Sequence, residues 1–220
     1  MKNKYKSIVI EGPIGVGKTT LATKLASSLE SKLMLESFSE NPFLEKFYKD
    51  VGKFNKYTKT SKYALATQLY FLLQRADEFK SKEYQALKRH NIISDYFIEK
   101  DKLFAKTILS SDEYLLYNRV HDGLKLNIEK PGLVIYLQTD AQTLVGRIKE
   151  RGVKFEGNIT EAYLQKIIDS YTAFFHSYKD SPLLIINTSN VNVNDPHGYT
   201  MLLEEINKDI KGKIYFNPIS

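Results

Sequence analysis

The sequence predicts an α/β fold in which a five-stranded parallel sheet is flanked by helices. Short runs rich in Ile, Val and Leu recur along the chain, and each is continuous rather than alternating, as in strands that are covered on both faces. Segments long enough for helices separate these runs, and such an alternation favours a parallel sheet wrapped by helices. The predicted strands are residues 7–10, 32–35, 91–94, 133–137 and 183–186.

Some helix ends can be located from the sequence. Ser110 precedes Glu113 by three residues, which is a capping-box pattern at the start of a helix. Gly152 follows another predicted helix and is expected to end it. No repeat, low-complexity tract or linker divides the chain, so we expect a single domain over residues 1–220. The predicted helices cover residues 19–31, 63–89, 112–126, 141–150 and 160–179.

The composition is typical of a soluble globular protein with one hydrophobic core. The chain has 220 residues, of which 42% are hydrophobic and 26% charged, and no apolar stretch approaches the ~20 residues that cross a bilayer. The absence of cysteine excludes disulfides, thiol catalysis and cysteine metal sites. The start, MKNKYKSIVIEG, has no signal or transit character. We therefore expect a cytoplasmic protein with no membrane partner.

The chain carries a net charge of +6, but its lysines are spread along the sequence instead of forming a basic run. This distribution favours a solvated, lysine-rich surface over a nucleic-acid-binding one. Positive charge near loops could equally serve a small polyanion such as a nucleoside triphosphate.

A phosphate-binding loop, the P-loop, is the most specific motif. Residues 12–19, GPIGVGKT, match the pattern of glycine, four residues, glycine, lysine, then serine or threonine, between a predicted strand and a predicted helix. Glycines let the backbone curl its N–H groups around phosphate oxygens. Lys18 adds a charge for the β and γ phosphates, and the Thr19 hydroxyl can coordinate Mg²⁺ at a helix N-terminus that favours anions. The predicted ATP-binding residues are Gly12, Pro13, Ile14, Gly15, Val16, Gly17, Lys18, Thr19 and Thr20.

The P-loop serves switch GTPases, motor ATPases and small-molecule kinases alike, so other residues must decide the function. Glu36 ends the second predicted strand, in MLESFSENPFLEKFY (residues 34–48), and this end of a parallel sheet borders the ligand crevice. Gln68 and Arg75 lie seven residues apart in the predicted helix, on one face. Taken alone, Glu36 is equally compatible with a surface carboxylate, and polar pairs on a helix face usually point to solvent.

Taken together, these motifs resemble the deoxynucleoside kinase family, and the resemblance extends from Lys6 to about Ile210. It implies a P-loop kinase fold and transfer of the γ-phosphoryl group of ATP, with Mg²⁺, to the 5′-hydroxyl of a deoxynucleoside. It also implies that Glu36 takes the proton from that hydroxyl, and that Gln68 and Arg75 contact the nucleobase.

The stretch after the third strand indicates a branch of the family. Many relatives have an acid, an arginine and a serine here, whereas this chain keeps Asp95, expected near Mg²⁺, and has Tyr96 in place of the arginine. This departure resembles the bacterial purine-specific branch of the family. The resemblance implies a purine deoxynucleoside as the substrate of this chain, with deoxyguanosine ahead of deoxyadenosine. The family has an acidic residue that pairs with the arginine corresponding to Arg75, and its position corresponds to Lys100 or Asp101 in this chain. We prefer Asp101, because a carboxylate would fix the guanidinium by charge-assisted hydrogen bonds.

Residues 147–158 resemble the arginine-bearing lid of the family. Arg147 and Arg151 are four apart on one helix face and are expected to neutralise charge on the transferring phosphoryl group. The resemblance assigns Glu156 to the sugar 3′-hydroxyl. Val153 replaces the last lid arginine, and the neighbouring Lys154 cannot reproduce a planar bidentate contact.

Three further expectations come from the resemblance alone. Tyr57 is a candidate partner of Glu156 at the 3′-hydroxyl. The loop over residues 188–192, including Asn190, is expected to contact the adenine of ATP, largely through backbone groups. A homodimer formed through two helices is usual in the family.

Other interpretations of the sequence stay open. Within the family, deoxyadenosine or broad deoxynucleoside specificity is the alternative. A nucleoside monophosphate kinase shares the loop and fold but needs an additional basic residue for the acceptor phosphate. A non-enzymatic nucleotide switch would use the P-loop to order a partner-binding surface, and it would not need a base-reading helix.

Overall fold

The sheet at the centre of the molecule has six strands rather than the predicted five. The computed structural model describes residues 3–51, 61–189, 191 and 195–216. Across the sheet the strands follow the order β2-β3-β1-β4-β5-β6, and every neighbouring pair is parallel. The strands are β1 (Ser7–Glu11), β2 (Lys32–Met34), β3 (Ile92–Ser94), β4 (Leu133–Gln138), β5 (Leu183–Asn187) and β6 (Lys213–Phe216).

The additional strand, β6, lies at the edge of the sheet next to β5. Ile214 is paired with Leu184 and Phe216 with Ile186. Phe216 is buried, whereas Tyr215 is 62% exposed. The prediction missed β6 because a short edge strand with one covered face lacks the continuous apolar run that marks the central strands.

Each of the five predicted helices overlaps a helix in the structure, but the described residues contain more helices than were predicted. The predicted helix over residues 63–89 is interrupted at Ser81, whose hydroxyl oxygen accepts a hydrogen bond from the backbone N–H of Tyr84 and caps α4. Helices α2, α5 and α9 lie in segments for which no helix was predicted. The α-helices in the described residues are α1 (Lys18–Ser28), α2 (Leu44–Val51), α3 (Ala64–Lys80), α4 (Lys82–Leu87), α5 (Lys100–Ile108), α6 (Ser111–Gly123), α7 (Ala141–Arg151), α8 (Glu161–Ser177) and α9 (Pro196–Asn207), with short 3₁₀ helices η1 (Phe38–Glu40) and η2 (Lys154–Asn158).

Two predicted helix ends are confirmed. Ser110 and Glu113 form a complete capping box at the start of α6, with each side chain bonded to the backbone of the other residue. Gly152 has a φ of 70°, in the left-handed region that glycine adopts without strain, and ends α7. The helix that carries Arg147 and Arg151 therefore ends at Arg151.

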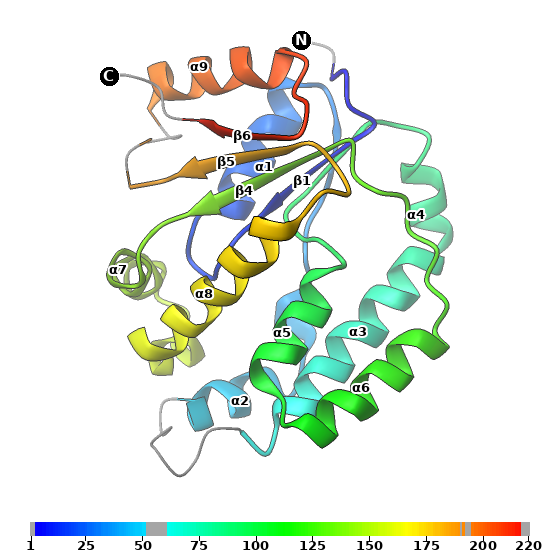
Figure 1. Cartoon of the computed structure of the whole chain (residues 1–220), viewed down its shortest axis with the longest axis vertical. Helices are drawn as coiled ribbons and strands as arrows, with labels where there is room; N and C mark the ends of the chain where they lie inside the picture. The colour runs from blue at the N-terminus through cyan, green and yellow to red at the C-terminus, as the bar shows by residue number, and fades with distance from the viewer. Residues whose placement is uncertain (1–2, 52–60, 190, 192–194, 217–220) are drawn as a thin grey trace.

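The helices form layers around the sheet (Figure 1). Helix α1 packs against β1, β2 and β3, while α3 packs against α5 and α6 in a helical layer below the sheet in this view. The chain runs from β1 to β2 and β3 on one side of β1, and it returns through β4 on the other side. The carboxyl ends of β1 and its neighbours therefore enclose a crevice, which is the usual ligand site of an open α/β sheet.

The core is formed by the central strands, whose side chains Ile8, Ile10, Ile135 and Leu137 are fully buried. At the end of β1, Gly12 has a φ of 150°, and a Cβ atom there would lie 2.5 Å from the carbonyl oxygen of Leu137. The P-loop can thus start this close to β4 only with a residue that has no side chain. Within the described part of the chain, no helix is long and apolar enough to cross a bilayer.

Candidate active site

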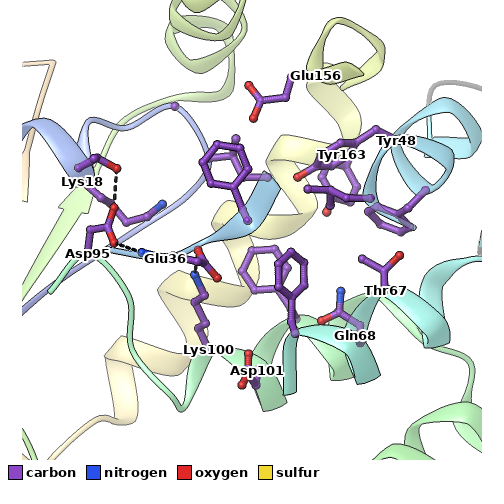
Figure 2. Close-up of a pocket in the computed structure, with 18 of the residues that line it drawn as sticks. Lys18, Glu36, Tyr48, Thr67, Gln68, Asp95, Lys100, Asp101, Glu156 and Tyr163 are labelled. Carbon is purple, nitrogen blue, oxygen red and sulfur yellow. Dashed lines mark hydrogen bonds and ion pairs between the residues drawn. The ribbon is translucent and has the colours of Figure 1, made fainter. Parts of the chain in front are cut away.

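A cavity of about 110 Å³ lies beyond the carboxyl ends of β1, β2 and β3 (Figure 2). Its walls come from the P-loop, from the segments that follow β2 and β3, and from helices α2, α3, α5 and α8. The cavity is therefore at the switch point that the strand order creates. It contains most of the residues that the sequence singled out.

The P-loop forms one end of the cavity. Gly15 and Gly17 have φ values of 83° and 104°, so the loop depends on glycine at both positions. The Nζ atom of Lys18 donates hydrogen bonds to the carbonyl oxygens of Gly12 at 2.7 Å and Pro13 at 3.1 Å. Burial lowers the pKa of Lys18, although the carboxylate of Glu11 opposes that change.

The predicted nucleotide-binding residues do not all face the cavity. Ile14, Gly15, Lys18 and Thr19 line it, whereas Val16 is buried in the core. Thr20 is exposed on α1 and lies outside the cavity wall. These positions agree with a loop that uses its backbone and one lysine to bind phosphate.

Glu11, the last residue of β1, supports the P-loop from below. Its Oε1 atom accepts hydrogen bonds of 2.8 Å from the backbone N–H of Gly12 and from the hydroxyl of Tyr171. Its side chain is fully buried, and burial raises its pKa. This buried carboxyl group was not found from the sequence, because it belongs to a run that was predicted as a core strand.

Thr19 and Asp95 come together at the mouth of the P-loop. The Thr19 hydroxyl donates a hydrogen bond to Oδ2 of Asp95, and Oδ1 of Asp95 accepts one of 2.9 Å from the backbone N–H of Glu36. A hydroxyl and a carboxylate are oxygen donors of the kind that Mg²⁺ binds together with phosphate oxygens and water. Thr19 and Asp95 therefore fit the Mg²⁺ ion that the sequence predicts at this position.

Glu36 lies two residues beyond the end of β2, and both its carboxylate oxygens are paired. Oε1 is 2.9 Å from a guanidinium nitrogen of Arg75, and Oε2 is 2.5 Å from Nζ of Lys100. Burial alone would raise the pKa of Glu36, but the charges of Lys100 and Arg75 lower it to about 2. Glu36 is thus a carboxylate that faces the P-loop lysine across the cavity, as Figure 2 shows.

Arg75 is held from several sides at the floor of the cavity. Its guanidinium is 2.7 Å from Asp101, and it lies over the rings of Phe71 at 5.2 Å and Tyr96 at 5.8 Å. The Tyr96 hydroxyl in turn donates a 2.7 Å hydrogen bond to Glu78. Of the two positions that the sequence left open for a partner of Arg75, Asp101 pairs with it and Lys100 pairs with Glu36.

Several buried polar atoms in the wall of the cavity lack a partner within the described residues. They are the Nε atom of Arg75, Oδ2 of Asp101 and Oγ1 of Thr67. Gln68 lies beside Thr67 and is 6% exposed. Burial raises the pKa of Asp101 to about 6, and Arg75 opposes that rise. Buried polar atoms without partners are costly, so this end of the cavity is suited to a ligand with hydrogen-bonding edges.

Aromatic side chains complete the cavity and were not found from the sequence. Phe71, whose ring lies under the Arg75 guanidinium, and Phe104 line the cavity. Tyr48 and Tyr163 line it near Glu156, as Figure 2 shows. An aromatic residue at helical spacing gives the same pattern whether it packs in the core or faces a ligand, so the sequence alone carried no signal for them.

The two lid arginines have different surroundings. Arg151 lines the cavity and forms an ion pair with Glu156, whose side chain is 4% exposed. Arg147 lies outside the cavity wall and donates hydrogen bonds to Thr188, at 2.9 Å to the hydroxyl and 3.2 Å to the carbonyl oxygen. Arg147 also donates a 3.4 Å hydrogen bond to the carbonyl oxygen of Val16, so it ties α7 both to the P-loop and to the loop after β5. The expected role of both arginines at the transferring phosphoryl group stays a prediction.

Two candidate residues cannot be placed. Tyr57 and Asn190 lie outside the residues that the structure describes. The neighbouring Thr188 is buried, and its backbone N–H donates to Gln138 at 2.7 Å, so the start of this loop is anchored on β4.

Comparisons with known proteins agree with this geometry. The sequence model of the family described as "Deoxynucleoside kinase" matches residues 8–211. A deoxyguanosine kinase of Bacillus subtilis (strain 168) is 33% identical over 170 residues, covering 77% of this chain and 78% of that protein. A deoxyadenosine kinase of Lactobacillus acidophilus (strain ATCC 700396 / NCK56 / N2 / NCFM) is 28% identical over 219 residues, covering 93% of this chain and 96% of that protein.

A solved structure has the same fold. The deoxyadenosine kinase from M. mycoides with bound dATP superposes with a TM-score of 0.75 at 26% sequence identity, covering 92% of this chain and all of that one. The match extends over both the P-loop side and the helical layer that holds Arg75 and Asp101, because it covers nearly the whole chain.

Proposed function

The chain belongs to the deoxynucleoside kinase family, and from this premise we propose that it phosphorylates a purine deoxynucleoside, deoxyguanosine first, with ATP and Mg²⁺. The observation that carries the proposal is the position of Glu36, a carboxylate that lines the same cavity as the P-loop lysine. A sugar hydroxyl bound between them would have a proton acceptor on one side and a phosphoryl donor on the other.

In the proposed reaction, the deoxynucleoside O5′ forms a bond to the γ-phosphorus of ATP while the bond from that phosphorus to the bridging oxygen breaks. Glu36 takes the proton of the 5′-hydroxyl, and ADP leaves. Lys18 and the P-loop amides bind the phosphates, and Arg151 neutralises charge on the transferring group. Thr19 and Asp95 would hold Mg²⁺, which, when bound, supplies charge neutralisation at the β and γ phosphates.

The nucleoside would lie with its base toward α3 and α5 and its sugar toward α2. Gln68, Arg75 and Asp101 provide the polar edge at the base end, and Phe71 and Phe104 provide apolar walls there. Glu156 is the candidate for the sugar 3′-hydroxyl. Arg147, which donates to Thr188 and to the carbonyl oxygen of Val16 in the P-loop, is the second candidate for neutralising charge on the transferring phosphoryl group.

The preference for guanine rests on donors and acceptors. The O6 and N7 atoms of guanine are both acceptors, which suit the donor-only guanidinium of Arg75. Adenine offers one acceptor and one donor on the same edge, and its amino group would have to donate a hydrogen bond to Gln68 or Asp101. Deoxyadenosine is the second candidate, since relatives of both specificities resemble the chain.

One assay separates these possibilities. The purified protein is given ATP and Mg²⁺ with each of the four deoxynucleosides, and separately with each of their 5′-monophosphates, and acceptor-dependent ADP release is measured. We expect the largest kcat/KM with deoxyguanosine. A larger value with deoxyadenosine would reverse the base preference, and turnover only with nucleoside monophosphates would indicate the monophosphate kinase instead. ADP release that no acceptor stimulates would favour a nucleotide switch.

We also propose a homodimer formed through α3 and α6. These helices pack side by side at the surface (Figure 1), and they carry exposed leucines: Leu73 is 46% exposed, Leu115 is 64% and Leu116 is 48%. Exposed apolar side chains that gather on neighbouring helices are typical of an interface.

A further inference from the structure

We propose that Lys100 is a catalytic residue, which leaves Glu36 when ATP binds and then contacts the transferring γ-phosphoryl group. This inference rests on the proposed function, because it assigns a role in the same reaction. It adds a second lysine to the phosphate-binding groups, one that is supplied by α5 and lies far from the P-loop in sequence.

Lys100 has the environment of a functional lysine rather than a surface one. It is the first residue of α5, and its side chain is only 9% exposed. Burying an ammonium group is costly unless the charge is compensated. The compensation comes from Oε2 of Glu36, 2.5 Å from Nζ, and from the charge of Glu11 at longer range.

Lys100 is also close to the P-loop lysine. The two ammonium groups are near enough for the positive charge of Lys100 to disfavour protonation of Lys18 and lower its pKa. Figure 2 shows both side chains directed into the cavity beside Glu36. Two cations that repel each other in the free protein would both be stabilised by a triphosphate placed between them.

The contact between Lys100 and Glu36 has to open during the reaction. A cation on each oxygen stabilises the charged form of the carboxylate, which makes Glu36 a weaker base for the proton of a substrate hydroxyl. Arg75 is fixed by Asp101 and by two aromatic rings, so it is the less mobile of the two cations. Lys100 has a flexible stem and rotating donors, and it can turn from Glu36 to a phosphate oxygen.

In this scheme Lys100 transfers no proton. Its arrival at the phosphoryl group neutralises charge there, and its departure leaves Oε2 of Glu36 free to take the proton from O5′. The O5′–phosphorus bond forms and the bond to the bridging oxygen of ADP breaks, as in the reaction above. The alternative is that Lys100 is only a permanent counter-ion for Glu36.

The charged and titratable neighbours of Glu36 bear on this exchange. Lys100 and Arg75 contact its carboxylate, and Asp95 accepts from its backbone N–H. At longer range it interacts with Lys18, Tyr48, Glu78, Tyr96, Asp101 and Tyr171. Among these neighbours only Lys18 and Lys100 are cations with flexible stems, and only Lys100 bonds the carboxylate directly.

The test compares K100M and K100R with the control K102M, which removes an exposed lysine from the same helix. Binding constants for ATP and ADP are measured by calorimetry, and kcat is measured with the best deoxynucleoside. For K100M we expect kcat to fall by about 10²-fold or more and ATP to bind about tenfold more weakly, with ADP binding unchanged, since only ATP carries the γ phosphate. K100R should recover part of the lost kcat, and K102M should match the original protein.

The counter-ion alternative predicts a different pattern. If K100M keeps kcat within about threefold, or if it loses ATP and ADP affinity alike, Lys100 does not contact the γ-phosphoryl group and the proposal is wrong. Should K100M fail to fold, K100Q, which keeps a donor toward Glu36, gives the same comparison of ATP with ADP. Absence of acceptor-dependent ADP release in the unaltered protein would instead contradict the proposed function, and the ATP-to-ADP comparison would still decide the role of Lys100.

Discussion

Arg75 and Asp101 form an ion pair of 2.7 Å whose side chains are 5% and 3% exposed, and the remaining Oδ2 atom of Asp101 has no partner among the described residues. The pair thus presents a fixed guanidinium and an unpaired carboxylate oxygen to the base end of the cavity. Such a pair discriminates between ligands, because a base with mismatched edges would leave buried charges unpaired.

The first prediction concerns this pair. D101N leaves the shape of the side chain but removes the charge that fixes Arg75, so we expect kcat/KM for the nucleoside to fall by about 10²-fold, since losing one partner of a buried charge pair costs about 2–5 kcal/mol. The KM for ATP should change little. D77N, at an exposed position on α3, is the control. An unchanged kcat/KM in D101N would remove the pair from base recognition.

The second prediction concerns Glu36. E36Q keeps the size of the side chain but cannot take a proton, and we expect turnover to fall by orders of magnitude while ATP binding, measured by calorimetry, stays intact. E83Q, at an exposed position on α4, serves as the control. Near-normal turnover in E36Q would discard Glu36 as the general base.

The third prediction concerns the pH dependence of stability. Burial raises the pKa of Glu99 to about 7, and its Oε2 atom is buried with no hydrogen-bond partner among the residues that the structure describes. Below the unfolded value of about 4.5 both states hold the proton, so the group then has no effect on stability. Between the two values only the folded state keeps the proton, and stability falls as pH rises.

E99Q removes this effect. We expect E99Q to be more stable than the original protein above pH 7, by up to on the order of 3 kcal/mol, with the difference vanishing toward pH 4.5. Urea unfolding at several pH values measures it. E161Q, at an exposed position on α8, should show no such trend, and a gain in E99Q that is independent of pH would contradict the assignment.

The fourth prediction concerns Gly12. A methyl group there would lie 2.5 Å from the carbonyl oxygen of Leu137, at a backbone φ of 150°. We therefore expect G12A to lower the free energy of unfolding by at least about 1–3 kcal/mol. G146A is the matched control, because a Cβ at this position in α7 meets open space and alanine favours helix by roughly 0.5–1 kcal/mol. A G12A protein as stable as the original would argue against this packing of the P-loop on β4.

The fifth prediction concerns the proposed dimer. Replacing Leu115 and Leu116 with glutamate places charges on the exposed face of α6, so we expect the mass measured by light scattering to fall from dimer to monomer. Y215E, on the edge strand β6, makes the same kind of change at a distant site and should stay dimeric. A monomeric original protein would end this proposal.

Much of the fold could be predicted because its central strands are buried on both faces. Continuous apolar runs revealed β1 to β5 to within one or two residues, and the P-loop followed from a motif whose physical requirements are strict. The break between α3 and α4 was missed because Ser81 ends one helix by capping the next, which leaves the helical pattern of apolar residues undisturbed.

The site was predicted where a contact is local or follows from a motif. The pairing of Asp101 with Arg75 follows from the affinity of a carboxylate for a guanidinium. Lys100 could not be assigned, because its partner Glu36 is distant in sequence and a lysine at the start of a helix is usually exposed. The position of Arg147 against Thr188 depends on how α7 meets the loop after β5, and no sequence pattern encodes that contact.

The family match ends at residue 211, immediately before the edge strand β6. A protein shortened to that boundary would lose the partner of Leu183 to Ile186 and leave the backbone groups of β5 open along one side. Open strands of this kind recruit other chains and promote aggregation. Recombinant versions of this protein should therefore be trimmed no earlier than Phe216, even though the family match stops at residue 211.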